Sequence, residues 1–197
     1  MDQKETKTPK RQITIAGKNG AGKSTVNKLL IEALPGYESY STGDFMRSIA
    51  AERGLTLDEL QDGARTDTSI DEKVDNLTLS LAQKEDFILD SRIGFHFLPQ
   101  AFVVFLDCPE EIAAERIVKN AHKDDARVGE SIESVDVVTQ NLKNRHEGDR
   151  KRYQNLYGIE NHLGHENFDF VIDTSVFTPE EVRDQILEAY QVHLAQE

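Results

Sequence analysis

Eight residues near the amino terminus combine two kinds of group that hold phosphate in proteins, backbone amides and a lysine. Residues 17–24 read Gly-Lys-Asn-Gly-Ala-Gly-Lys-Ser, which matches the pattern Gly-x-x-x-x-Gly-Lys-Ser. The glycines allow successive backbone N–H groups to turn inward around phosphate oxygens. Lys23 can reach the β- and γ-phosphates of a nucleotide, and the Ser24 hydroxyl can ligate Mg²⁺. We therefore predict a nucleotide-phosphate site, called the P-loop below, made of Gly17, Asn19, Gly20, Ala21, Gly22, Lys23, Ser24 and Thr25.

The segments on either side of the P-loop have the patterns that must position it. The apolar run at 13–16 predicts a strand, and residues 26–34 carry apolar side chains at helical spacing up to the Pro-Gly pair at 35–36. A helix that starts here points the positive end of its dipole at bound phosphate. The motif thus lies between a strand and a helix, which is the context that its chemistry requires.

Two further stretches carry groups that could bind a second phosphate. Residues 41–47, Ser-Thr-Gly-Asp-Phe-Met-Arg, predict a turn into a helix. Ser41 or Thr42 could hydrogen-bond a nucleotide there, and Arg47 could hold a phosphate with two hydrogen bonds. Residues 90–92, Asp-Ser-Arg, follow a predicted buried strand, at the edge where ligands bind in parallel α/β sheets. Asp90 could orient water bound to Mg²⁺, and Arg92 could bind the phosphate of an acceptor.

Two of these residues, and one further strand-end aspartate, also have a plainer explanation. Ser41 could be an ordinary helix N-cap and Arg47 a solvated side chain. Asp107 ends another predicted strand, and for it a structural role in a turn is as well supported as a functional one.

A group of basic residues stands out in a chain that is otherwise acidic. Five of them fall within a dozen positions near residue 150, and their cations could neutralise a phosphoryl group in transfer beneath a closing lid. The alternative is that some form ion pairs on a helix surface with Glu147 and Asp149. The five are Lys143, Arg145, Arg150, Lys151 and Arg152, and a lid could add Arg116, Lys119 and Arg127.

Composition limits the possible classes of function. With 197 residues and a net charge of −13, the chain is large enough for one domain and too acidic for nucleic-acid binding as its main role. Its single cysteine, Cys108, forms no internal disulfide, and we expect it to be buried beside a strand end. No apolar run is long enough to span a membrane. We expect a cytoplasmic monomer without nucleic-acid or membrane partners, whose six histidines show no metal-ligand spacing.

The order of the predicted elements indicates an α/β fold. Strands alternate with helices, which predicts a parallel sheet covered by helices on both faces. Residues 1–11 are polar and predict a disordered tail, so that 12–197 form a single domain. The polar segment between the last two strands is the natural place for a lid. The predicted strands are 12–16, 37–40, 87–89, 102–106 and 168–173.

Read together, these stretches resemble those of nucleoside monophosphate kinases, and most of all the short cytidylate kinases typical of archaea and some bacteria. The more family-specific parts are Ile-Asp-x-x-Val-Asp at 70–75 and Arg-Tyr…Tyr-Gly-Ile at 152–159. The resemblance implies a three-layer P-loop kinase fold with a five-stranded parallel sheet. It places a short helical region that binds the nucleoside monophosphate at 41–92 and a lid within about 120–152. The matching stretches are the P-loop, 41–47, 52–59, 70–75, 91–92, 114–117, 152–159 and 168–175.

The resemblance also implies the activity. ATP with Mg²⁺ is the expected phosphate donor, CMP or dCMP is the acceptor, and the products are CDP or dCDP. Catalytic roles fall on Lys23, Arg92, Arg145 and Arg150. Acceptor binding falls on Ser41, Asp44, Arg47 and Arg92, metal binding on Ser24 and Asp90, and ATP binding on the P-loop with Arg116.

Two departures from the family pattern leave the acceptor open. Ser-Thr-Gly-Asp-x-x-Arg with Thr42 is also how adenylate kinases read, and Asp90-Ser91 stands where the family often has Glu-Gly. The alternatives are an adenylate kinase-like or other small-acceptor kinase and, outside the kinases, a nucleotide switch that only hydrolyses ATP. A second phosphate site at Arg47 and Arg92 argues against the switch, because a switch has no acceptor to bind.

Overall fold

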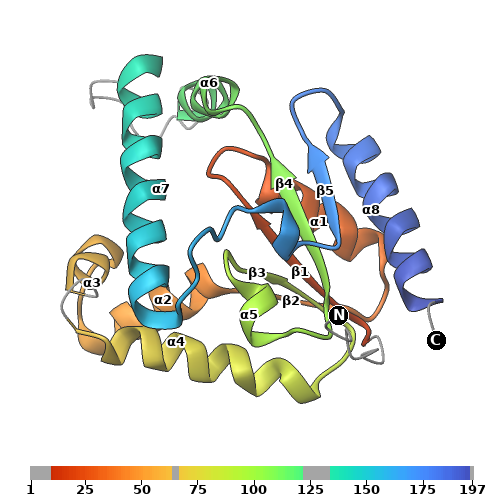
Figure 1. Ribbon diagram of the computed structural model, residues 1–197, viewed down its shortest axis with the longest axis horizontal. Helices are drawn as coiled ribbons and strands as arrows, with labels where there is room; N and C mark the ends of the chain where they lie inside the picture. The colour runs from red at the N-terminus through yellow and green to blue at the C-terminus, as the bar shows by residue number, and fades with distance from the viewer. Residues whose placement is uncertain (1–9, 64–66, 122–133, 196–197) are drawn as a thin grey trace.

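A five-stranded sheet forms the centre of the computed structural model, which describes residues 10–63, 67–121 and 134–195. Its order is β2-β3-β1-β4-β5, and every pair of neighbouring strands is parallel (Figure 1). The central strand β1 is buried along its whole length, as a parallel strand covered on both faces must be. The predicted fold class is thereby confirmed. The strands are β1 (Gln12–Gly17), β2 (Glu38–Ser41), β3 (Phe87–Asp90), β4 (Phe102–Asp107) and β5 (Phe170–Asp173).

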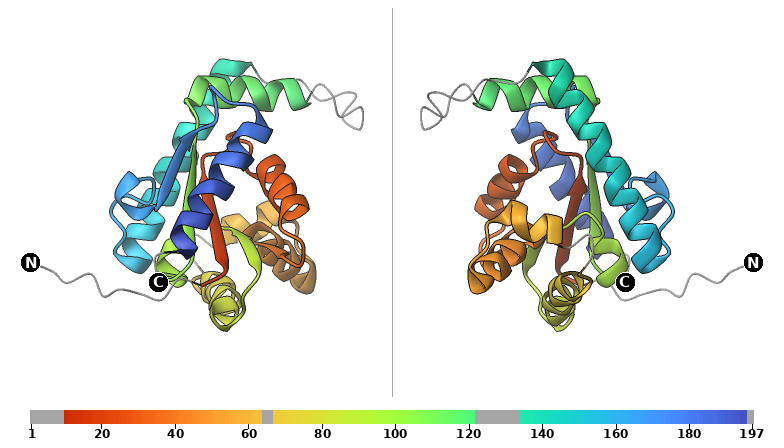
Figure 2. Two further views of the ribbon diagram at one scale, coloured as in Figure 1. Left: turned by 90° about the vertical axis from the view of Figure 1, so that its right-hand side faces the viewer. Right: turned by 90° about the vertical axis from the view of Figure 1, so that its left-hand side faces the viewer.

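Helices cover both faces of the sheet and give the molecule three layers (Figure 2). On one face, α1 (Lys23–Ala33) and α8 (Pro179–Leu194) lie side by side. On the other face lie the short α5 (Gly94–Phe97) and the long α7 (Val135–Tyr157). The remaining helix beyond β4, α6 (Glu110–Ala121), packs against α7. The main apolar core lies between the sheet and these helices.

Between β2 and β3 the chain forms three helices with a small apolar core of their own. They are α2 (Thr42–Arg53), α3 (Leu57–Gly63) and α4 (Ser69–Ser80). Ile49 of α2 and Ile70 of α4 are both buried in this core. Residues 41–92, which the resemblance assigns to acceptor binding, therefore contain a helical unit outside the main core.

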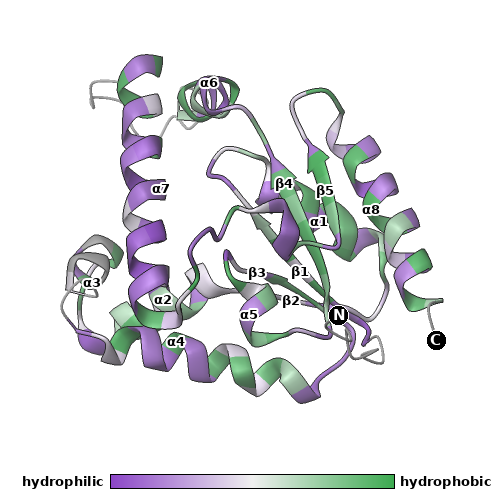
Figure 3. Ribbon diagram, in the orientation of Figure 1, coloured by the Kyte–Doolittle hydropathy of each residue, from purple (hydrophilic) through white to green (hydrophobic). Residues whose placement is uncertain are grey.

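Helix α7 occupies much of the predicted lid segment. Its sequence is hydrophilic over most of its length (Figure 3), and its buried residues are Val138, Leu142 and Tyr153. Because so few apolar side chains hold it, polar contacts must decide how it sits against the rest of the chain. The part of the lid prediction at 122–133, including Arg127, lies outside the described residues.

The predicted tail lies mostly outside the described residues, which begin at Lys10. Lys10 Nζ donates to the carbonyl of Ala82 at 2.7 Å, and Arg11 forms ion pairs with Glu85 and Asp86. The chain is thus anchored two residues before β1 begins. None of the described helices combines the length and apolar character that crossing a membrane would demand.

Candidate active site at the carboxyl ends of the strands

The P-loop joins the end of β1 to the start of α1, as the sequence predicts. Gly22 is the N-cap of α1, with φ of 89°, so the first N–H groups of the helix face the loop. Gly20 has φ of 82°, and a Cβ placed there would lie 2.6 Å from the carbonyl oxygen of Ala113 on α6. This close approach fixes the loop between β1 and α6, and only glycine satisfies both conditions.

Lys23 lies inside the loop and donates to its carbonyl groups. Its Nζ is 2.8 Å from the oxygen of Gly17 and 3.1 Å from that of Lys18. Burial lowers the pKa of Lys23 to about 8; the carboxylate of Asp90 opposes this, while Arg92 and Arg145 lower the pKa further. Residues from the P-loop, β3 and α7 therefore form one electrostatic cluster.

Asp90 ends β3 beside the P-loop, because β3 pairs with β1 and places Asp90 opposite Ile15. Burial raises the pKa of Asp90, and the positive charges of Lys23 and Arg92 oppose the rise. A cavity of about 340 Å³ is lined by both Asp90 and Ser24. One carboxylate and one hydroxyl fit Mg²⁺, which takes few protein oxygens and completes its shell with phosphate and water. Among the described residues no group of three or more His, Cys, Asp or Glu forms another candidate metal site.

The same cavity contains the residues predicted to bind the acceptor from β2 and α2. Ser41, Asp44 and Arg47 line it together with Ser24 and Asp90. Ser41 caps α2, since its Oγ accepts from the N–H of Gly43. Asp44 and Arg47 form an exposed ion pair one turn apart. The cavity thus brings the donor-side Ser24 next to the acceptor-side Arg47, although Ser41 also has the structural role that the sequence left open.

Arg92 bridges the P-loop and α7. Its Nη2 donates to Asn19 Oδ1 at 2.9 Å, and its Nε lies 3.4 Å from Asp149 Oδ2. The hydroxyl of the buried Tyr153 also acts on the guanidinium electrostatically. The guanidinium is therefore held beside the phosphate loop by partners on two elements.

The basic residues of α7 separate into different surroundings. Arg145 is close enough to Lys23 to affect its pKa. Arg150 donates twice to Glu147, at 2.9 Å each, and Lys151 pairs with the same carboxylate. Arg152 forms an ion pair with Asp71 of α4. The charge of Arg145 thus acts on the P-loop lysine, whereas Arg150 and Lys151 form the surface pairs that the sequence offered as the alternative.

Arg116 and the residues after β4 surround the other side of the P-loop. The Arg116 guanidinium donates to the carbonyl and hydroxyl of Thr174, at 2.7 and 3.2 Å. Cys108 is fully buried, as predicted. Asp107 accepts from the N–H of Cys108 and forms an ion pair of 3.1 Å with Lys18. Asp107 therefore has a structural role, which includes holding a P-loop side chain.

Comparison with known proteins gives this arrangement a family. A family model described as "AAA domain" matches residues 13–137. A cytidylate kinase of Haloquadratum walsbyi is 36% identical over 180 residues, which cover 90% of this chain and 87% of that protein. A cytidylate kinase of Methanobrevibacter smithii is 30% identical, over 91% of this chain and 98% of that protein. The chain belongs to the cytidylate kinase family. The predicted resemblance is confirmed, and the site is that of a P-loop enzyme of the nucleoside monophosphate kinase type.

One further sequence relative and one solved structure are also similar to this member of the cytidylate kinase family. An S-adenosylmethionine-dependent nucleotide dehydratase of Lacinutrix mariniflava is 36% identical over 92% of this chain, but the chain spans only 36% of that longer protein. Among solved structures, shikimate kinase from Acinetobacter baumannii superposes with a TM-score of 0.61 at 20% identity, covering 94% of this chain and 95% of that one. At that identity the likeness shows the fold alone.

Two residues of the site were not predicted from the sequence. Asp149 and Tyr153 contact Arg92. In the sequence, Asp149 was considered only as an acidic residue within the basic group, as a partner for ion pairs on a helix surface. Asp149 lies four residues after Arg145 on α7, so both face the same side of the helix. An acidic residue on the basic face of a helix indicates a specific cationic partner.

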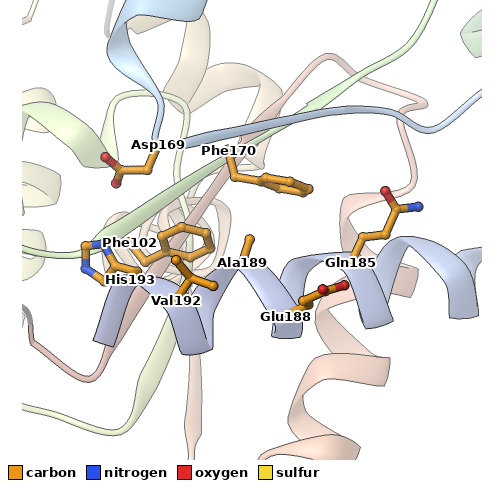
Figure 4. A pocket seen from close by; sticks show the side chains of 8 residues that line it. All are labelled: Phe102, Asp169, Phe170, Gln185, Glu188, Ala189, Val192 and His193. Carbon is orange, nitrogen blue, oxygen red and sulfur yellow. The ribbon is translucent and has the colours of Figure 1, made fainter. Parts of the chain in front are cut away.

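A second, larger cavity has no connection with this site. It measures about 480 Å³ and lies between α8 and the starts of β4 and β5 (Figure 4). Phe102 and Phe170 line it from the strands, and Val192 and His193 line it from α8. The P-loop lies at the opposite ends of the strands. The larger of the two cavities is therefore not the one that contains the candidate active-site residues.

The close approach at Gly20 predicts a sensitive position. We expect Gly20→Ala to destabilise the protein by about 1–2 kcal/mol or more, because alanine disfavours positive φ and its Cβ would contact Ala113. Gly148→Ala is the matched control, since Gly148 lies inside α7 with open space around it and alanine favours helices by about 1 kcal/mol. Chemical denaturation should shift in opposite directions for the two variants; equal shifts would contradict the account of the loop.

Proposed function

We propose that the protein transfers the γ-phosphoryl group of Mg·ATP to the phosphate of CMP or dCMP. The observation that carries the proposal is the meeting of two phosphate-binding sets in one place. Lys23 and the P-loop amides would form one set, and Arg92 and Arg47 would form the other. Arg92 acts on the pKa values of Lys23 and Asp90, and Arg47 lines one cavity with Ser24 and Asp90. An enzyme that only hydrolysed ATP would have no use for the second set.

In this reaction the chain would position and neutralise rather than abstract a proton. The attacking oxygen belongs to a phosphate that is already ionised, so no general base is required. Lys23 would hold the phosphoryl group that leaves the donor, while Arg92 and Arg145 would offset the charge that develops on it. Asn19 and Asp149 would hold Arg92 in place for this task. Mg²⁺ held at Ser24 and Asp90 would supply further charge neutralisation.

The lid remains part of the proposal. Closure of the segment that includes α7 over the site would exclude water and prevent loss of ATP to hydrolysis. Among the basic residues of α7, Arg145 is the one whose charge lowers the pKa of Lys23, so we assign it the contact with the transferred phosphoryl group. Arg150 would need to leave Glu147 to take part. Arg116 would contribute to the donor nucleotide from its place beside Thr174.

The relatives support a nucleotide as acceptor and leave the base to experiment. Two of them are cytidylate kinases, which favours CMP over AMP. The dehydratase relative also acts on nucleotides by its name, but nearly two thirds of its length has no counterpart in this chain. Its named reaction is therefore not proposed here.

A coupled assay of ADP formation tests the function directly. Purified protein with Mg·ATP is given CMP, dCMP, UMP, AMP or GMP in turn. We expect kcat/KM to be highest with CMP or dCMP. Preferential use of AMP would favour the adenylate kinase-like alternative, and ADP release that is the same with and without every acceptor would favour the nucleotide switch.

A further inference from the structure

Arg116 and Arg145 are the two arginines in the described part of the chain that form no ion pair with a carboxylate. Each of the others pairs with an aspartate or glutamate side chain. The charge of Arg145 acts on Lys23, which links it to the phosphate site. Arg116 lies on α6, and its guanidinium, which stays protonated in proteins, keeps its positive charge. What holds this arginine must therefore be something other than a counter-ion.

Uncharged atoms hold the Arg116 guanidinium in place. Its Nη2 donates to the carbonyl oxygen of Thr174 at 2.7 Å, and its Nη1 donates to the Thr174 hydroxyl at 3.2 Å. Nη1 also lies 3.7 Å from the Sγ of Cys108, and burial raises the pKa of that thiol, so it stays neutral. Hydrogen bonds from Ser175 are the main cause that lowers the pKa of the exposed Asp173, and Arg116 adds a smaller effect. The guanidinium is thus fixed without being neutralised.

The orientation of the Thr174 hydroxyl is set by a second partner. Thr174 is only 4% exposed, and its Oγ1 lies 3.1 Å from the carbonyl oxygen of Asp107. A hydroxyl has one proton, and a carbonyl oxygen can only accept, so the Thr174 hydroxyl donates to Asp107 and accepts from Arg116. The N–H of Thr174 donates to the same carbonyl at 2.9 Å. The side chain of Asp107 in turn pairs with Lys18 of the P-loop, so a continuous series of contacts joins Arg116 to the loop.

Arg116 lies on the side of the P-loop away from the acceptor cavity. It follows Ala113 by one helical turn, and the carbonyl of Ala113 closely approaches Gly20. Figure 1 shows α6 beyond the carboxyl end of β4, the edge of the sheet where the P-loop also lies. The acceptor cavity is lined instead from α1, β2, β3 and α2. A fixed, unpaired cation in this place suits the negative charge of the donor nucleotide.

We propose, resting on the proposed function, that Thr174 is a positioning residue for the donor nucleotide. Its hydroxyl and carbonyl hold Arg116 by the edge of the guanidinium and leave the positive charge for the phosphates of ATP. A carboxylate in the same position would hold the arginine as firmly, but it would cancel that charge and repel the phosphates. Two neutral acceptors on one residue avoid this conflict.

Thr174→Val tests the role of the hydroxyl with little change of volume. The N–H of residue 174 can still donate to Asp107, and its carbonyl can still accept from Arg116, so we expect the variant to fold. The KM for ATP should rise about three- to tenfold, while kcat and the KM for CMP stay within about twofold of the wild type. Thr174→Ser, which keeps the hydroxyl, should restore the KM for ATP. Calorimetric titration with ADP should show the same loss and recovery of affinity without turnover.

Thr78→Val is the matched control for the loss of a buried threonine hydroxyl. Thr78 is 1% exposed, and its Oγ1 donates within α4 to the carbonyl of Val74 at 2.9 Å. We expect this variant to bind ADP as the wild type does. If Thr174→Val likewise changes the unfolding midpoint but not the affinity for ADP, the contact with Arg116 is purely structural and the inference is wrong, although the kinase function stands.

A double variant tests whether Thr174 acts through Arg116. Arg116→Gln alone should weaken ADP binding more than Thr174→Val, and adding Thr174→Val to it should weaken binding no further. Additive losses, or wild-type affinity in Arg116→Gln, would overturn the inference. A wild type that phosphorylates no monophosphate would overturn the proposed function instead, and the ADP titrations would still decide the role of Thr174.

Discussion

Lys23→Ala is expected to lower kcat by about a hundred- to a thousandfold with saturating ATP and CMP, while the protein remains folded. Lys23 is a half-buried lysine of the P-loop, and its amino group would hold the phosphoryl group as it leaves the donor. Its removal takes a desolvated charge out of the structure, so we expect little or no loss of stability. Steady-state kinetics and a thermal unfolding curve on the same preparation measure the two quantities.

Lys84→Ala is the control for the loss of a lysine. Lys84 precedes β3, at the amino ends of the strands, and its exposed ammonium contacts Tyr40 and Glu38. We expect its kcat to stay within about twofold of the wild type, because exposed pairs contribute little. Near-normal turnover in Lys23→Ala would contradict the mechanism proposed for the loop.

Arg92→Gln is expected to have the second large effect, on both activity and stability. Loss of the guanidinium should lower kcat/KM for the acceptor by about a hundred- to a thousandfold, since it would bind acceptor phosphate and offset transition-state charge. It also leaves Asp149, whose side chain is 13% exposed, without its cation. Breaking a pair this deeply buried should destabilise the protein by about 2–3 kcal/mol, below the full cost of a completely buried pair. Arg183→Gln on α8, whose partner is the exposed Asp184, is the neutral control.

The double variant Arg92→Gln/Asp149→Asn separates the two effects. It removes the unpaired carboxylate, so the denaturation midpoint should return most of the way to the wild-type value. Activity should stay as low as in Arg92→Gln, because the guanidinium is still absent. Recovery of activity together with stability would mean that Arg92 acts only by holding α7, and the role given to it in catalysis would be wrong.

The fold was predictable because its signals are local. Every strand except the edge strand β2 contains a short apolar run, and the P-loop carries its own strand and helix context. Asp90 and Arg92 were predicted to lie near the loop for a topological reason, since the carboxyl ends of parallel strands meet at one edge. The structure places both in the cluster around Lys23.

The roles of the basic residues on α7 were not predictable, because they depend on which face each residue takes and on distant partners. Arg145 and Arg150 look alike in the sequence, yet Glu147 is within reach of Arg150 one turn away and binds it. The links from α7 to α4 join residues as far apart as Tyr157 and Asp75, 82 positions along the chain. Local spacing carries no information about such contacts, which appear only when two helices are packed together.

The hydrogen bonds of Lys23 within its own loop have a consequence for the thermodynamics of nucleotide binding. With a pKa of about 8, the free protein holds this proton only part of the time in mildly alkaline solution. Phosphate oxygens that replaced the carbonyls of Gly17 and Lys18 would favour the charged ammonium and raise its pKa. Binding of a nucleotide would then draw a proton from the buffer, so affinity would decline as the pH rises above 8, and the heat of binding there would depend on the buffer's own enthalpy of ionisation.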